Sequence, residues 1–270
     1  MPQLNSSEIL LEVERLFEWV KNGGSSYRFI SNHFQSVDIS STFNSIKDLA
    51  LRNSFIVSHI VLNEKNDFYK LESVYKELVQ NIVPENFVEH WLQNALDDEI
   101  SDLLRNISII DLGFGYALHQ FVLAFKSNDF ETLMNSWKYI SGKPISAPVK
   151  RKLNLVGGVS KENVESFILA FNRLIKRCGY SGWIIFFESI NNVTLQRSEI
   201  ARNESYNNIR QILDLIGANV IKNVFIIFSS SDPNFLHTDI HNYKALAERI
   251  YPETDLYQLY HDIRSTIWVV

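Results

Sequence analysis

The stretch Gly179–Asn192, GYSGWIIFFESINN, is the strongest indication of how this chain folds. Its apolar run, Trp183–Phe187, is short, and short apolar runs are typical of strands buried on both faces of a parallel sheet. The run leads into Glu188, and the next position is Ser189. The stretch therefore predicts a central strand that ends in one acidic side chain followed by a hydroxyl.

Similar apolar runs on both sides of this stretch predict further strands. They are Arg28–Ile30, Phe55–Leu62 (FIVSHIVL), Asn223–Phe228 (NVFIIF) and the terminal IWVV. The helices that we expect between them have apolar residues at helical spacing and span residues 7–20, 42–51, 161–177, 198–216, 239–249 and 254–264. The alternation of strands and helices favours a parallel α/β fold.

The middle of the chain has a different pattern. From Phe68 to about Trp137 the apolar spacing is helical, and a connector with two prolines, SGKPISAPVKRK (141–152), follows. We therefore expect an α-helical insertion between strands. The predicted organisation is an N-terminal helix in residues 1–24, a first part of the α/β core in 25–67, the insertion and connector in 68–152, and a second part of the core in 153–270.

Composition excludes several classes of protein. The 270 residues carry a net charge of -5, which argues against a strongly basic nucleic-acid binder. The one cysteine, Cys178, excludes a disulfide framework and a cysteine-built zinc site within the chain. No apolar run approaches the roughly 18 residues of a membrane span, and the N-terminus shows no signal pattern. We therefore expect a cytoplasmic protein that does not contact membranes.

Four segments together resemble a known family. In chain order they are YKLESVYKELVQNI (69–82), GYSGWIIFFESINNV (179–193), RSEIARNESYNNIRQILD (197–214) and NVFIIFSSSDPNFLHTDIHNYKALAERI (223–250). They resemble the ATP-binding proteins associated with BREX phage-defence systems, a branch of the AAA-type P-loop ATPases. The resemblance covers roughly residues 20–250. It implies a three-layer, P-loop/AAA-like parallel sheet flanked by helices, with an α-helical insertion.

The phosphate-binding loop of that family has no counterpart in this sequence. The family places G-x-x-G-x-G-K-[ST] between the first strand and its helix, where this chain has SNHFQSVDISSTF (31–43), without glycine or lysine. By spacing, the lysine position falls near Ile39 and the hydroxyl position near Ser40. Glycines let backbone N–H groups converge on phosphates, and the lysine neutralises their charge. Asp38 would instead add negative charge there.

The other nucleotide-site positions are partly retained. The family's acidic strand ends Asp-Glu, where the aspartate holds Mg²⁺ and the glutamate polarises water; this chain has Glu188 and Ser189. A Thr-Pro pair after the next strand corresponds to Asp232-Pro233, and the arginine of the closing helix is kept as Arg249. We interpret Ser40, Glu188, Ser189, Asp232 and Arg249 as vestigial positions. We expect no catalytic residue and no cofactor beyond weak ATP–Mg²⁺ binding.

Three functions remain open on this basis. The first is a catalytically inactive, AAA-like assembly or regulatory subunit of a prokaryotic anti-phage defence system. Its partner would be a second copy, a helicase or an active ATPase, and nucleic acid would be reached through that partner. The second is an active ATPase whose nucleotide site has a non-standard form or is completed by a partner. The third is a nucleic-acid-binding module; absence of any ATPase ancestry is the simplest alternative to all three.

Three shorter motifs give weaker evidence of a binding site. Lys150, Arg151 and Lys152 form the one basic cluster, which suits either phosphate contacts or a solvated connector. His237 and His241 have a spacing that can bind metal on a helix, but no glutamate follows the first histidine, and we expect no metal site. The G-x-G of LGFGYALH (112–119) lacks a third glycine, and we expect a turn before a helix there.

Overall fold

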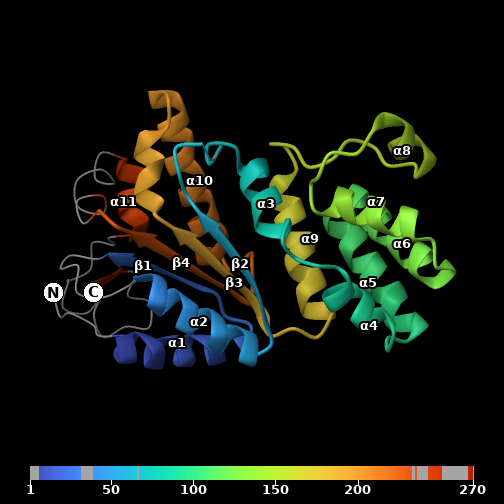
Figure 1. Cartoon of the computed structure of the whole chain (residues 1–270), viewed down its shortest axis with the longest axis horizontal. Helices are drawn as coiled ribbons and strands as arrows, with labels where there is room; N and C mark the ends of the chain where they lie inside the picture. The colour runs from blue at the N-terminus through green and yellow to red at the C-terminus, as the bar shows by residue number, and fades with distance from the viewer. Residues whose placement is uncertain are drawn as a thin grey trace. The chain divides into compact units, whose positions relative to one another are not determined.

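The computed structural model describes residues 6–31, 39–65, 67–232, 235, 243–250 and 267–269. The chain divides into two compact units (Figure 1). Unit 1 contains Met1–Lys70 and Ser181–Val270, and unit 2 contains Leu71–Tyr180. The expected helices at 254–264 and at the start of 239–249 lie outside the described residues.

Unit 1 is built on a parallel sheet. Its described strands follow the order β2-β3-β4-β1-β5, and every neighbouring pair is parallel. Their bounds are β1 Ser26–Ser31, β2 Phe55–Val61, β3 Gly182–Glu188, β4 Val224–Ser230 and β5 Ile267–Val269. This arrangement confirms the predicted α/β class and puts the run that ends in Glu188 between two other strands.

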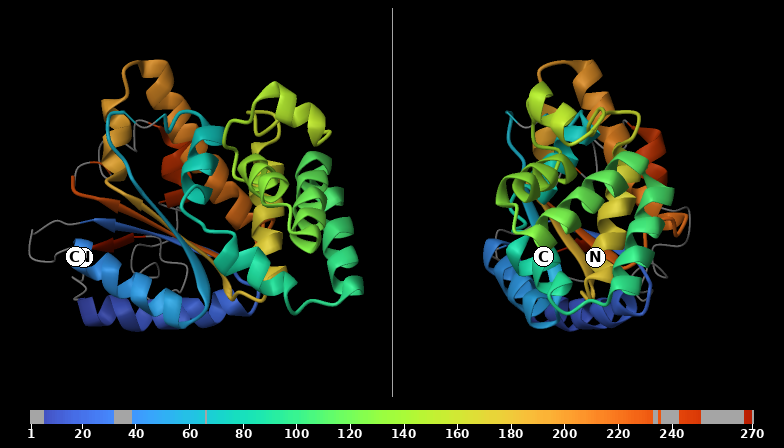
Figure 2. Two further views of the ribbon diagram at one scale, coloured as in Figure 1. Left: turned by 45° about the vertical axis from the view of Figure 1, so that its right-hand side comes forward. Right: turned by 90° about the vertical axis from the view of Figure 1, so that its right-hand side faces the viewer.

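Helices cover both faces of this sheet. Figures 1 and 2 show α1 and α2 on one face and α10 and α11 on the other, so unit 1 has three layers. The bounds are α1 Ser6–Lys21, α2 Ile39–Arg52, the 3₁₀ helix η2 Ile190–Leu195, α10 Glu199–Gly217 and α11 Lys244–Ile250.

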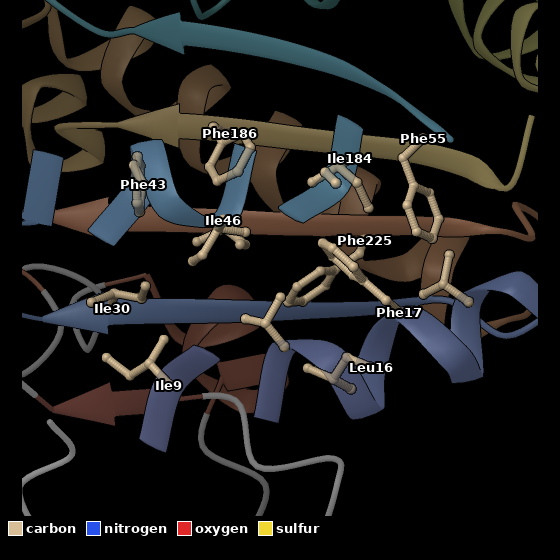
Figure 3. Close-up of a cluster of buried hydrophobic side chains, with 14 residues drawn as sticks. Ile9, Leu16, Phe17, Ile30, Phe43, Ile46, Phe55, Ile184, Phe186 and Phe225 are labelled. Carbon is tan, nitrogen blue, oxygen red and sulfur yellow. The ribbon is translucent and has the colours of Figure 1, made fainter. Parts of the chain in front are cut away.

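The face under α1 and α2 holds an apolar cluster (Figure 3). Phe17 of α1 packs on Phe55, with ring centroids 4.8 Å apart, and Phe43 of α2 lies 4.9 Å from Phe186. Ile184 and Phe186 point into this cluster because side chains of a strand alternate between its faces. Glu188, two residues further along β3, therefore faces the same side.

An aromatic row fills the opposite face. Phe29 of β1 stacks on Phe228 of β4 at 4.6 Å, and Phe228 stacks on Phe187 of β3 at 5.1 Å. Phe68 meets Phe187 edge-on at 5.5 Å. Phe187 and Phe228 are completely buried. The row links three neighbouring strands and explains why β3 is apolar on both faces.

The regular elements described in unit 2 are all helices, joined by turns and irregular segments. Its elements are α3 Leu71–Val79, the π-helix η1 Glu85–Glu89, α4 His90–Leu92, α5 Asp97–Ile110, α6 Leu112–Ser127, α7 Phe130–Ile140, α8 Ala147–Lys152 and α9 Val164–Arg177. No helix in the described ranges combines the length and the apolar character that crossing a bilayer requires.

The position of α9 differs from the predicted organisation, which assigned residues 153–270 to the α/β core. Residues up to Tyr180 belong to unit 2. The reason is aromatic packing: Phe167 and Phe171 of α9 meet the ring of Tyr75 edge-on, at 5.7 and 6.3 Å. Trp137 of α7 also lies against Phe171, at 6.3 Å. An amphipathic pattern shows that a helix has an apolar face but does not identify what covers it.

The G-x-G of residues 113–115 also differs from expectation. Both glycines lie inside α6, not in a turn before it. Asp111 starts the helix by accepting a hydrogen bond from the Phe114 amide at 2.8 Å. A side chain at Gly115 would collide with Ser108, because its Cβ would lie 2.7 Å from the Ser108 Cα. The glycine therefore allows α5 and α6 to approach closely.

The aromatic row supplies a test of the sheet. We expect Phe228→Ala to lower the free energy of unfolding by about 3–5 kcal/mol, because it removes a buried ring from between two others. Urea denaturation measures the change. Leu51→Ala, at a residue 62% exposed in the same unit, is the control and should change stability by less than about 0.5 kcal/mol. Equal effects of the two substitutions would contradict this description of the core.

Candidate functional site

The topology of the sheet singles out its carboxyl-terminal edge. The connection after β1 runs through α2 on one face to β2, whereas the connection after β4 passes through α11 on the other face to β5. Neighbouring strands whose connections leave on opposite faces open a crevice at their carboxyl ends, where ligands of open parallel sheets bind. The ends of β1, β3 and β4 therefore define the candidate site.

Glu188, the last residue of β3, forms one end of a side-chain relay. Its Oε2 lies 2.9 Å from Nε2 of His59 on β2. The other ring nitrogen, Nδ1, lies 2.6 Å from Nζ of Lys47 on α2. The side chains of His59 and Glu188 are each 22% exposed. We call this arrangement the Lys47–His59–Glu188 relay.

Strand register brings the relay together. His59 pairs with Phe186 and Val61 pairs with Glu188, so His59 and Glu188 face the same side of adjacent strands. That side is covered by α2, which carries Lys47. The rings of Phe43 and Phe186 flank His59, with centroids 6.1 and 5.9 Å from the imidazole. The relay thus lies at the border between the apolar cluster and the carboxyl edge.

Charge and burial both shift the pKa values of His59 and Lys47 in the relay. Burial lowers the pKa of His59, the Lys47 ammonium lowers that pKa further, and Glu188 opposes both effects. Burial also lowers the pKa of Lys47, again opposed by Glu188. A neutral imidazole satisfies all three groups, because Nε2–H donates to the carboxylate while Nδ1 accepts from the ammonium.

Ser189 turns the chain out of the sheet. Its backbone is left-handed, with φ 58° and ψ 46°, and η2 begins at the next residue. This conformation costs a residue other than glycine about 1–2 kcal/mol. The amide of Leu62 donates to the Glu188 carbonyl at 2.9 Å, which continues the β2–β3 ladder up to this turn. The residue that follows Glu188 therefore forms a tight turn and carries a hydroxyl.

Asn191 joins the loops after β3 and β4, a role that the sequence did not suggest. Its Oδ1 accepts from the Ser231 amide at 3.1 Å and from the Ser230 hydroxyl at 3.3 Å. The Asp232 amide donates to the Ser230 hydroxyl at 3.2 Å. Asp232 therefore lies in a turn beside η2. The sequence feature that could have indicated this turn is the pair Asn191-Asn192 shortly after the strand, because side-chain amides commonly stabilise turns.

Arg249 pairs with a residue of α10, and Ser40 lies at the start of α2. Ser40 is an exposed residue in the first turn of α2. Arg249 of α11 donates from Nε to Asp214 of α10 at 2.9 Å, and its carbonyl accepts from the Tyr27 hydroxyl. Tyr27 is the second residue of β1, so this contact lies toward the strand's amino end. Asp38, Pro233, His237 and His241 lie outside the described residues.

The basic cluster of unit 2 is partly engaged within its own unit. The Lys150 ammonium donates to the Gly157 carbonyl. Nζ of Lys152 lies 3.6 Å from a Glu131 carboxylate oxygen. Arg151 is exposed at the surface of α8. Two of the three cations therefore already have internal acceptors.

The described side chains at the carboxyl edge do not fit a magnesium–nucleotide complex. The carboxylate of Glu188 is already paired with His59, and no carboxylate directly follows it. Nowhere in the described parts of the chain do three His, Cys, Asp or Glu side chains gather as a metal site.

One comparison with known proteins gives a match. A family model described as "BREX system ATP-binding protein BrxC/D" matches residues 85–267, which is more than half of the chain. The matched range includes Glu188, Ser189, Asp232 and Arg249, and it begins after β1, α2 and β2. No curated protein matches the chain.

The relay predicts how stability depends on pH. The pKa of His59 is lowered on folding, so its contribution to stability is present above the unfolded value of about 6.5 and is lost as pH falls through the folded value. We expect the free energy of unfolding to fall more between about pH 7.5 and 5.5 in the native chain than in His59→Asn. The asparagine can still accept from Lys47 but does not titrate. Identical pH dependence in both proteins would refute this protonation scheme.

Proposed function

The chain belongs to the family of BREX system ATP-binding proteins BrxC/D, and on this premise we propose that it is a non-hydrolysing, AAA-like subunit of a BREX phage-defence system. Its role there is to assemble or regulate other components in the cytoplasm. The observation that carries the proposal is the pairing of Glu188 with His59 at 2.9 Å, with Lys47 behind it.

The pairing of Glu188 with His59 bears on function because related ATPases use the carboxylate at this strand end to hold a metal ion. There the carboxylate holds hydrated Mg²⁺, and a second acid orients the attacking water. In this chain, cationic Lys47 and the ring of His59 occupy the position next to Glu188. The carboxylate would have to leave this partner before it could serve a metal ion, which opposes metal binding.

Two other parts of the sequence also support loss of ATP hydrolysis. Ser189 replaces the water-orienting acid, and residues 31–43 contain neither the glycines nor the lysine of a phosphate loop. Removing a single preorganised group of this kind typically lowers turnover by about 10²–10³-fold. Because these changes affect different parts of one site, they support loss of hydrolysis more strongly than either does alone.

An exposed apolar row on α6 supports a protein partner. Leu112, Tyr116 and Leu123 follow helical spacing along one face, and Leu112 and Leu123 are 75% and 48% exposed. Contiguous exposed apolar side chains are typical of surfaces that bind other proteins. A second copy of this chain, a helicase or an active ATPase is the partner, and nucleic acid is reached through it.

Phage challenge of cells that lack only this gene tests both parts of the proposal. We expect the native chain and Glu188→Gln to restore protection equally, because the proposed role needs no metal at Glu188. The double substitution Leu112→Glu and Leu123→Glu should abolish protection while the protein remains folded. The efficiency of plating, with protein levels measured by immunoblot, reports the outcome.

Ile200→Glu is the matched control for the α6 row, since Ile200 is an apolar side chain 77% exposed on the other unit. It should retain protection. Loss of protection in Glu188→Gln at normal protein level would refute the non-hydrolysing role. Full protection by the double substitution would refute docking through α6.

A further inference from the structure

We propose that the open edge of β2 pairs with β2 of a second copy of this chain, in antiparallel orientation about a two-fold axis at Ser58. The sheets of the two copies then join into one continuous sheet. The inference rests on the backbone and the sequence of β2. It depends neither on the proposed loss of ATP hydrolysis nor on docking through α6.

The edge of β2 is open in the described parts of the chain. The strand comes first in the sheet order, so β3 is its one neighbouring strand (Figure 3). The described elements that pack against β2 are β3 and α2, and α2 covers a face of the sheet rather than its edge (Figure 1). A further strand can therefore be added beside β2.

The backbone of β2 offers hydrogen-bonding groups along this edge. The Leu62 amide donates to the Glu188 carbonyl of β3. Because successive residues direct their backbone groups to opposite sides of a strand, every second residue before Leu62 also points to β3, and the others point away from it. The residues that point away are Phe55, Val57, His59 and Val61. Within the described residues, their backbone N–H and C=O groups have no recorded partner.

The sequence of β2 does not protect this edge. Exposed edges are usually blocked by proline, by lysine or other charged side chains, or by a β-bulge. The strand FIVSHIV contains none of these residues, and its register with β3 is continuous. Its one titratable side chain, His59, is held in the relay. At the end of the strand, Val61 is 51% exposed. A regular, uncharged edge of this kind favours pairing with another strand.

The strand is complementary to itself, which identifies the occupant as a second copy. Apolar residues lie symmetrically about Ser58: Ile56 corresponds to Ile60, and Phe55 corresponds to Val61. In the antiparallel pairing each residue faces its counterpart in the partner subunit. Apolar side chains then lie opposite apolar side chains, which stabilises an antiparallel pair, and no two like charges meet.

The same register aligns the free backbone groups. Phe55 faces Val61 of the partner subunit, and Val57 faces His59 of the partner subunit. All four residues of these pairs direct their backbone groups outward, so each pair exchanges two hydrogen bonds. The arrangement is isologous and uses both β2 edges, so it stops at a dimer. The His59 side chain stays on the face covered by α2, where the relay holds it.

Disulfide cross-linking tests the predicted register. Ser58 lies on the axis in a non-hydrogen-bonded pair, where the two Cα atoms are about 4.5 Å apart and a disulfide can form. We expect mild oxidation to convert the folded, full-length Ser58→Cys variant to a covalent dimer on a non-reducing gel. The native chain should stay uncrosslinked, because its Cys178 is buried and burial raises the pKa of the thiol.

Val61→Cys is the control for register. This position is more exposed than Ser58, but it lies three residues from the axis, so the two cysteines would be about 20 Å apart in the dimer. It should not cross-link. Equal cross-linking of the two variants would show random collision and overturn the proposal.

Sedimentation velocity provides a second test that does not alter Ser58, whose hydroxyl accepts a hydrogen bond from Trp183. We expect the native chain to be a dimer at micromolar concentration. Val61→Lys should weaken the dimer at least about tenfold, because it places an ammonium against the buried ring of Phe55 in the partner subunit. Val220→Lys is the matched control, since Val220 is 49% exposed in the same unit, and it should leave the dimer unchanged.

The α6 variant separates this dimer from the proposed docking surface. The double substitution Leu112→Glu and Leu123→Glu should leave the dimer intact. A monomeric native chain would overturn the proposal, and so would a dimer that Val61→Lys does not weaken. A dimer lost in the α6 variant but kept in Val61→Lys would place the contact on α6 and also overturn it.

Discussion

Burial of β3 on both faces is the constraint on which the rest of unit 1 depends. Trp183–Phe187 are at most 3% exposed, with the apolar cluster on one side and the aromatic row on the other. Burial of a charged group on such a strand is costly unless the group has a partner. Glu188 is that group, and the parallel register of β2 supplies His59 as its partner.

The sequence predicted the elements better than their contacts. Short apolar runs located β2, β3 and β4 to within a few residues, because strands covered on both faces need a continuous apolar sequence. The relay was not predictable in this way. Lys47 and His59 lie twelve residues apart on a helix and a strand, and Glu188 is 129 residues beyond His59. Only the strand order and register bring these residues together.

The two differences between the predicted and the observed structure, at α9 and at Gly115, both arise from packing. Periodicity showed that α9 has an apolar face but not that Phe167 and Phe171 face Tyr75 in unit 2. Likewise, Gly115 looked like a turn residue, whereas its missing side chain serves helix packing against Ser108. The first outcome depends on a residue far along the chain and the second on how two consecutive helices pack, and local patterns encode neither.

Two of the three relay residues lie outside the family match. The match covers β3 and β4, with the acidic strand end, whereas Lys47 and His59 precede it. The N-terminal part of unit 1 thus supplies the cation and the imidazole that engage Glu188. One arrangement of three residues therefore pairs Glu188 within the protein.

The most direct test of this account is calorimetric titration of the purified chain with ATP and Mg²⁺. Because Glu188 is already paired within the protein, the account predicts no saturable heat at nucleotide concentrations up to about 1 mM, which corresponds to binding weaker than about -4 kcal/mol. Stoichiometric binding that requires Mg²⁺ and disappears in Glu188→Gln would contradict it.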